Sequence, residues 1–120
     1  MSSPQARDVI RFERDGAVLY GVIETALLMG EDARGVNDVV IDEAQGPSAD
    51  ARLVAIDLSR VTNINSVAIG VLVSIKLSME RIGKRFALVG AAGPIRELLK
   101  VTNLTAVFET YSTRESVRVD

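Results

Sequence analysis

The stretch 53–83, LVAIDLSRVTNINSVAIGVLVSIKLSMERIG, constrains the fold of this chain more than any other part of the sequence. Residues 53–56 form a short apolar run that polar residues close, which predicts a strand covered on both faces of a sheet. After a polar loop, apolar residues recur at helical spacing from Ser66 onward. Gly83 is suited to follow the helix, because glycine adopts positive φ at low cost.

The predicted helix carries apolar residues on two sides. The side expected to pack on the core carries Ala68, Leu72, Ile75, Met79 and Ile82. A second line follows helical spacing on the opposite side, where a solvent-facing helix should be polar. That line consists of Ser66, Gly70, Val73 and Leu77. Either other elements cover it, or it is a small apolar docking surface with Ser66 at its upper edge.

The junction between strand and helix holds the residues with chemical meaning. Asn65 or Ser66 can cap the helix, since a short side-chain oxygen accepts from the free N–H groups of the first turn. Ser66 could also take a phosphate, because a helix N-terminus tolerates an anion. The modification would add about −1.5 to −2 charges at pH 7 and repel an apolar or acidic partner. The residues alone leave both roles open, and Asp57 is expected to brace the loop.

Composition limits the function more than it defines it. The 120 residues suggest one domain, 1–120, with its core at about 8–117, and 48% apolar content predicts a globular fold. A net charge of −2 gives no nucleic-acid footprint. The sequence has no Cys and no His, which removes disulfides, the usual zinc sites, thiol nucleophiles and any Ser-His-Asp triad. These absences leave any catalysis to carboxylates such as Asp57, to Lys84 or to hydroxyls, and we expect no metal and no cofactor. No apolar run reaches membrane-spanning length, so we expect no membrane partner and a cytoplasmic protein.

The first half of the chain predicts a hairpin and a helix. Asp15-Gly16 separates two β-like runs, 9–14 and 17–23, and so predicts an antiparallel hairpin. Residues 1–7 are expected to fray, and 24–30 are ambiguous between a loop and a short edge strand. A helix is expected at 31–44, before a surface loop at 45–52. Its buried face would carry Ala33, Val36, Val40 and Ala44.

The second half predicts strand–helix alternation. Residues 85–89 read as a buried strand, and 106–109 as a last short strand. Pro94 suits the first position of an intervening helix, and Asn103 is expected to close it in the left-handed conformation. That helix is expected to pack through Ile95, Leu98, Leu99 and Val101. Capping-box spacing at 112–115 predicts a stub of helix at 116–120.

These elements predict an α/β fold. A mixed β-sheet would contain the N-terminal hairpin and right-handed βαβ units, with helices packed on the sheet. The glycine-rich turn at 90–93 precedes a helix and raises the alternative of a nucleotide-binding or enzymatic domain. It lacks the Gly-Lys-Ser/Thr ending of a P-loop and the spacing of a dinucleotide fingerprint, so the sequence favours a tight turn.

The segment DLSRVTNINSVAIGVL resembles the signature of the STAS domain, which occurs in anti-sigma-factor antagonists and sulfate-transporter tails. The matching positions are Asp57, Leu58, Ser59, Val61, Ile64, Ser66, Ile69, Gly70 and Leu72. The run IGKRFALVGAAGPIRELLKVTNL resembles the second βα unit of the family. The resemblance covers about 9–117. It departs from the family where Asn65 replaces Asp, where Val67 and Ala68 replace Ser/Thr and Gly, and where Asn103 replaces a frequent Gly.

The resemblance implies a regulatory protein-binding module without chemistry of its own. In the family an anti-sigma factor that is also a serine kinase phosphorylates the serine at the position of Ser66, and the unphosphorylated antagonist binds it. The residues then expected to contact a partner are Asn65, Ser66, Val67, Ile69, Gly70, Val73 and Leu77. The departures favour an alternative: a divergent scaffold subunit that packs on other STAS proteins or forms a homodimer. The antagonist reading depends on Ser66, whereas the scaffold reading rests on the apolar Val67, Val73 and Leu77.

Overall fold

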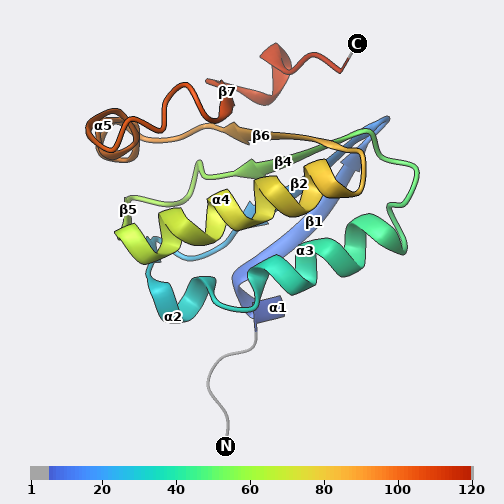
Figure 1. The fold of residues 1–120 in the computed structure, drawn as a ribbon, viewed down its shortest axis with the longest axis horizontal. Helices are drawn as coiled ribbons and strands as arrows, with labels where there is room; N and C mark the ends of the chain where they lie inside the picture. The colour runs from blue at the N-terminus through green and yellow to red at the C-terminus, as the bar shows by residue number, and fades with distance from the viewer. Residues whose placement is uncertain (1–5, 120) are drawn as a thin grey trace, which may run out of the picture.

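A five-stranded mixed sheet forms the centre of the computed structural model, which describes residues 6–119 (Figure 1). Along the sheet the order is β1-β2-β4-β6-β7. The bounds are β1 Ile10–Asp15, β2 Val18–Ile23, β4 Leu53–Asp57, β6 Arg85–Val89 and β7 Glu109–Tyr111. β1 is antiparallel to β2, and the other neighbouring pairs are parallel. The predicted mixed α/β fold is therefore confirmed.

Shorter elements complete the described chain. A second sheet pairs β3, Leu27–Leu28, in parallel with β5, Asn63–Ile64. The helices are α1 Ala6–Val9, α2 Gly30–Ala33, α3 Val36–Gln45, α4 Ser66–Arg81 and α5 Gly93–Val101, with a 3₁₀ turn, η1, at Arg114–Ser116. Among the described residues, no helix has the length and apolar character needed to cross a membrane.

The N-terminal hairpin forms as predicted. Asp15 lies opposite Val18, and Gly16 takes φ 58° in the turn between them. β1 begins one residue later than expected, because Val9 closes α1. Ala6 and Arg7 belong to that one-turn helix, so the expected frayed end is wrong for them, while 1–5 lie outside the described residues.

The helix predicted at 31–44 is two helices. Gly35 takes φ 84°, a conformation that a helix cannot continue through, so α2 ends at Ala33 and α3 begins at Val36. The predicted buried face is correct despite the break. Ala33, Val36, Val40 and Ala44 are each at most 3% exposed.

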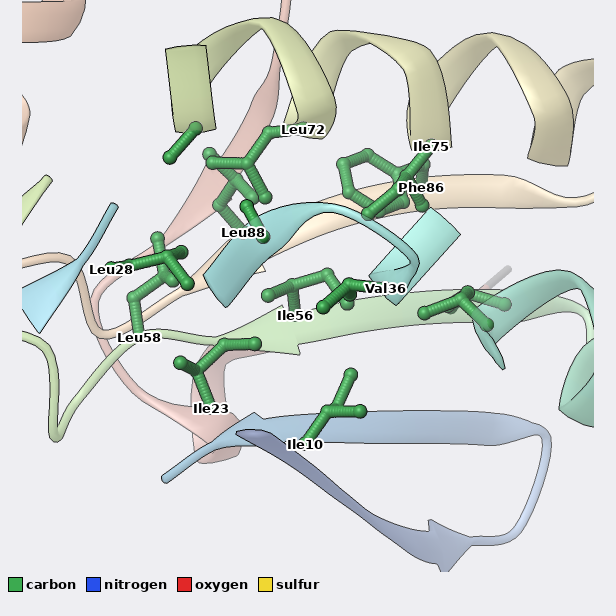
Figure 2. Close-up of a cluster of buried hydrophobic side chains, with 14 of the residues drawn as sticks. Ile10, Ile23, Leu28, Val36, Ile56, Leu58, Leu72, Ile75, Phe86 and Leu88 are labelled. Atoms are coloured by element: carbon green, nitrogen blue, oxygen red, sulfur yellow. The ribbon is translucent and has the colours of Figure 1, made fainter. Parts of the chain in front are cut away.

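The helices α3 and α4 cover one face of the sheet. The main core lies between these helices and the strands (Figure 2). Leu72 and Ile75 point from α4 toward Phe86, Leu88 and Ile56 on the strands. Four of the five residues expected on the core side of α4 are fully buried, and Ile82 at the helix end is half-buried. The predicted central strand β4 is buried along its whole length, which confirms that both its faces are covered.

The segment after β7 covers the other face of the sheet. A second buried cluster on that face consists of Val18, Tyr20, Leu53, Ala55, Ala87 and Val89. Tyr111, Val117 and Val119 pack against it. The expected helix stub at 116–120 is wrong: the turn is η1, 117–119 have no regular structure, and Asp120 lies outside the described residues. The capping box joins Thr113 and Ser116, one residue later than expected.

The region around α5 required three corrections. Pro94 is the second residue of the helix rather than the first, because Ala92 is the N-cap. Val101 does not pack on the sheet but is 72% exposed at the end of α5. The last strand begins at Glu109, since Phe108 is drawn into the core against the ring of Phe86, at a centroid distance of 6.1 Å. Asn103 has φ 61° as predicted.

Candidate functional site

The start of α4 is organised by the side chain of Asn65. Its Oδ1 accepts a hydrogen bond from the backbone N–H of Ala68 at 2.9 Å, and its own backbone is extended. Asn65 is therefore the N-cap of the two candidates. Upstream, Asp57 Oδ1 accepts from the N–H of Ser59 at 2.9 Å, which confirms that Asp57 braces the loop after β4.

Ser66 is the first helical residue and is not needed for capping. It is exposed, and within the described residues its hydroxyl has no hydrogen-bond partner. The first N–H groups of a helix have no intrahelical acceptor, and Asn65 satisfies only that of Ala68. Thus the plain capping role is wrong for Ser66, and a phosphate there would meet free N–H groups.

The remaining residues of the expected partner surface divide by exposure. Val67 and Leu77 are 49% and 52% exposed, and Gly70 is exposed. Val73 is half-buried and packs against the core. We call Ser66, Val67, Gly70, Val73 and Leu77 the α4 surface. No described element buries it fully, although the packing of Val73 against the core accounts for part of its apolar character.

Ile69 is not part of that surface. It is 4% exposed and belongs to the main core, so the expectation that it contacts a partner is corrected. Ile69 follows the buried Ala68 and precedes the buried Leu72 by three residues, and it widens the buried stripe of the helix. α2 and α3 pack along this side of α4, which the spacing of a single helix could not reveal.

Val67 is held close to α2. A Cβ built on Gly30 would lie 2.7 Å from Cγ1 of Val67, so the valine occupies the space that a side chain at position 30 would need. Nearby, Leu27 of β3 pairs with Asn63 of β5 and is 51% exposed, whereas Leu28 is buried. The sequence reading did not identify Leu27, although an adjacent apolar pair in a strand sends one side chain to each face.

An arginine from the C-terminal segment holds Asp57. Arg114 donates from Nε to Asp57 Oδ2 at 3.0 Å and from Nη1 to Glu13 at 2.6 Å, and its guanidinium lies 4.3 Å from the ring centroid of Tyr20. Burial raises the pKa of Asp57, but hydrogen bonds from Ser59 and Arg114 outweigh it and hold that pKa below its ordinary value. The sequence reading missed Arg114, which lies 57 residues away from its partner.

The fold and the site together define a small α/β module with an exposed serine at the start of its central helix. A family model described as STAS domain matches residues 18–117. The chain belongs to the STAS domain family, and the resemblance that the sequence suggested is confirmed. No curated protein sequence matches the chain significantly.

Solved structures with this fold include anti-sigma-factor antagonists. A candidate anti-sigma factor antagonist from Thermotoga maritima is 25% identical, with 92% of each chain covered and a TM-score of 0.74. An anti-sigma-factor antagonist (STAS) domain protein from Planctomyces limnophilus is 26% identical, with 88% of this chain and 92% of that chain covered and a TM-score of 0.77. The phosphorylated form of the Bacillus cell fate determinant SpoIIAA, at 13% identity, 88% and 93% coverage and a TM-score of 0.63, shares the fold alone. The chain is thus a STAS domain that resembles anti-sigma-factor antagonists.

Proposed function

We propose that this protein is a non-catalytic regulatory module of the antagonist type, which binds an anti-sigma factor with serine kinase activity. The observation that carries the proposal is the exposed Ser66 at the first position of α4, with Asn65 as the cap. A kinase can reach that hydroxyl without unfolding the helix. The partly exposed Val67 and Leu77 supply apolar surface for a partner.

In this proposal, phosphorylation switches binding without a change of fold. The phosphate adds about −1.5 to −2 charges at pH 7, and the free N–H groups at the start of α4 stabilise it locally. A partner that buries the α4 surface would have to desolvate that charge. Binding is then lost while the domain keeps its structure.

The replacement of the family Asp by Asn65 fits this function. Asn caps a helix about as well as Asp does, so the helix start is retained. The change removes a negative charge next to Ser66, which we propose alters the choice of kinase rather than the use of the serine.

The test uses four purified baits in native-host lysate with ATP. Wild type and Ser66→Ala should capture a kinase-bearing partner, and Ser66→Asp should lose it. Ser112→Asp is the matched control and should keep the partner, because Ser112 is also exposed but follows β7 and adds the same charge outside the α4 surface. Mass spectrometry of wild type should place phosphate on Ser66.

Equal capture by the Ser66→Asp bait and wild type would refute the switch. Recovery of other STAS proteins by all four baits, together with a dimer in light scattering, would favour the scaffold alternative. The half-exposed Val67 and Leu77 are compatible with either partner, so the charge response decides between them.

A further inference from the structure

A cavity of about 580 Å³ lies beside α5 and contains none of the α4 surface. It lies at the carboxyl ends of β6 and β7, where the turn from Gly90 leads into α5. The volume is within the roughly 300–1,000 Å³ typical of small-molecule sites. The proposed antagonist function makes no use of this cavity.

Two cations line the cavity without a protein partner. Arg96 and Lys100 lie one helical turn apart on α5, and within the described residues the side chain of neither makes a hydrogen bond or an ion pair. Glu97 is the one carboxylate in the lining, so the charged side chains there sum to +1. The whole chain carries a net charge of −2, so its general charge does not explain this local excess.

The rest of the lining combines apolar surface with hydroxyls. Leu88 and Leu99 are buried residues that contribute an apolar wall. Thr105, Thr110 and Ser112 also line the cavity, and their hydroxyls have no hydrogen-bond partner in the part of the chain that the structure describes. A ligand with an apolar body and polar substituents would match this surface.

The turn itself does not form a phosphate cradle. Pro94, the second residue of α5, has no N–H, and the N–H groups of Ile95 and Arg96 both donate to the carbonyl of Ala92 at 3.0 Å. Only the N–H of Gly93 remains in the first turn. An anion in this cavity must therefore be held by the side chains of α5.

We propose that this cavity binds a small organic anion. Its anionic oxygen group, a carboxylate or a phosphate, pairs with Arg96 and Lys100, since charge-assisted hydrogen bonds are the strongest that such a site can offer. Its apolar body lies against Leu88 and Leu99. This site is independent of Ser66 and of any protein partner.

The direct test is an NMR titration of the ¹⁵N-labelled full chain. The probes are 1-naphthoate and 1-naphthyl phosphate, with neutral 1-naphthalenemethanol and inorganic phosphate as controls. Both organic anions should give saturable shifts at the amides of Gly90, Gly93, Thr105 and Thr110, and the tighter of the two identifies the head group. The affinity for each control should be at least about tenfold lower, because each control lacks either the charge or the apolar body.

Two double variants separate charge pairing from general attraction. Arg96→Ala/Lys100→Ala should weaken naphthoate binding by about tenfold or more. Arg52→Ala/Arg81→Ala removes the same charge from exposed positions outside the cavity and should leave the affinity within about twofold. Unchanged amide shifts elsewhere in each variant show that the fold is retained.

Three results would each overturn the proposal. They are the absence of saturable shifts at the cavity up to about 10 mM probe, equal affinity in the two double variants, and binding of the neutral alcohol as tightly as the carboxylate. Loss of the Ser66 switch would leave this proposal unaffected, so the two ideas fail separately.

Discussion

Arg114 Nε lies 3.0 Å from Asp57 Oδ2 and joins the 3₁₀ turn η1 to the end of the central strand β4. The side chain of Asp57 is 8% exposed, and that of Arg114 is 34% exposed. Glu13 of the edge strand β1 accepts from the same guanidinium. One arginine therefore connects the C-terminal segment both to β1 and to Asp57, the residue that holds the loop after β4.

We predict that Arg114→Ala lowers the free energy of unfolding by about 1–3 kcal/mol, because it leaves a buried carboxylate with fewer partners. Urea unfolding measures the change. Arg52→Ala is the control. It should lower the free energy of unfolding by less than about 0.5 kcal/mol, because Arg52 is exposed and has no ion pair in the described structure. Equal losses in the two variants would show that Arg114 contributes nothing specific.

The lowered pKa of Asp57 predicts a definite pH dependence. A carboxyl with a folded pKa below its unfolded value, about 3.9, stabilises the fold above that value and loses this contribution as the pH falls through the folded pKa. The stability difference between wild type and Asp57→Asn should be largest above about pH 5 and should shrink in acid. Unfolding curves at several pH values measure it, and a difference that grows in acid would contradict the assigned direction.

Asn65→Ala should destabilise the domain by about 1 kcal/mol, because it removes the acceptor for the N–H of Ala68. Asn65→Asp keeps the acceptor and adds a favourable charge at the start of α4, so it should be neutral or stabilising by about 0.3–1 kcal/mol. Thermal unfolding of the three proteins tests this order. Equal stability of the Ala and Asp variants would rule out capping by residue 65.

Gly30→Ala should cost about 1–3 kcal/mol, because its Cβ would overlap Val67. Val67→Ala removes the obstructing methyl groups, so the double variant should recover part of the loss. The coupling free energy from a double-mutant cycle should exceed about 0.5 kcal/mol. Additive effects would show that the two helices do not meet at this point.

Gly70→Ala should separate stability from binding. Nothing lies within 4 Å of a Cβ at this position, so alanine should stabilise α4 by about 0.5–1 kcal/mol. The added methyl group lies on the α4 surface and should weaken binding of the proposed partner. Chemical denaturation and the capture assay measure the two effects, and unchanged capture would place Gly70 outside the interface.

The sequence predicted the central unit because its signals are local. The apolar run, the polar loop and the helical spacing all fall within 53–83. From them β4, the start of α4 and most of the buried side of α4 were predicted correctly. The break at Gly35 was missed because Ala33, Val36, Val40 and Ala44 keep helical spacing across it. Only tertiary packing reveals that the glycine takes positive φ.

The errors at the site come from contacts between distant segments. Ile69 was assigned to the partner surface because the packing of α2 and α3 against α4 leaves no pattern in the sequence of the helix itself. Arg114 meets Asp57 only after the chain has crossed the sheet, and Leu27 gains its position from β5. Exposure and pairing of this kind depend on the assembled fold, whereas capping depends on neighbouring residues.

The two outer strands of the sheet differ in how they limit pairing with a strand of another chain. β1 is an edge strand and carries Arg11, Glu13, Arg14 and Asp15 among its six residues, while the opposite edge, β7, has only three residues. Charged and very short edges discourage the edge-to-edge strand pairing that leads to aggregation. Both ends of the sheet are thus poor templates for a strand added from a second chain.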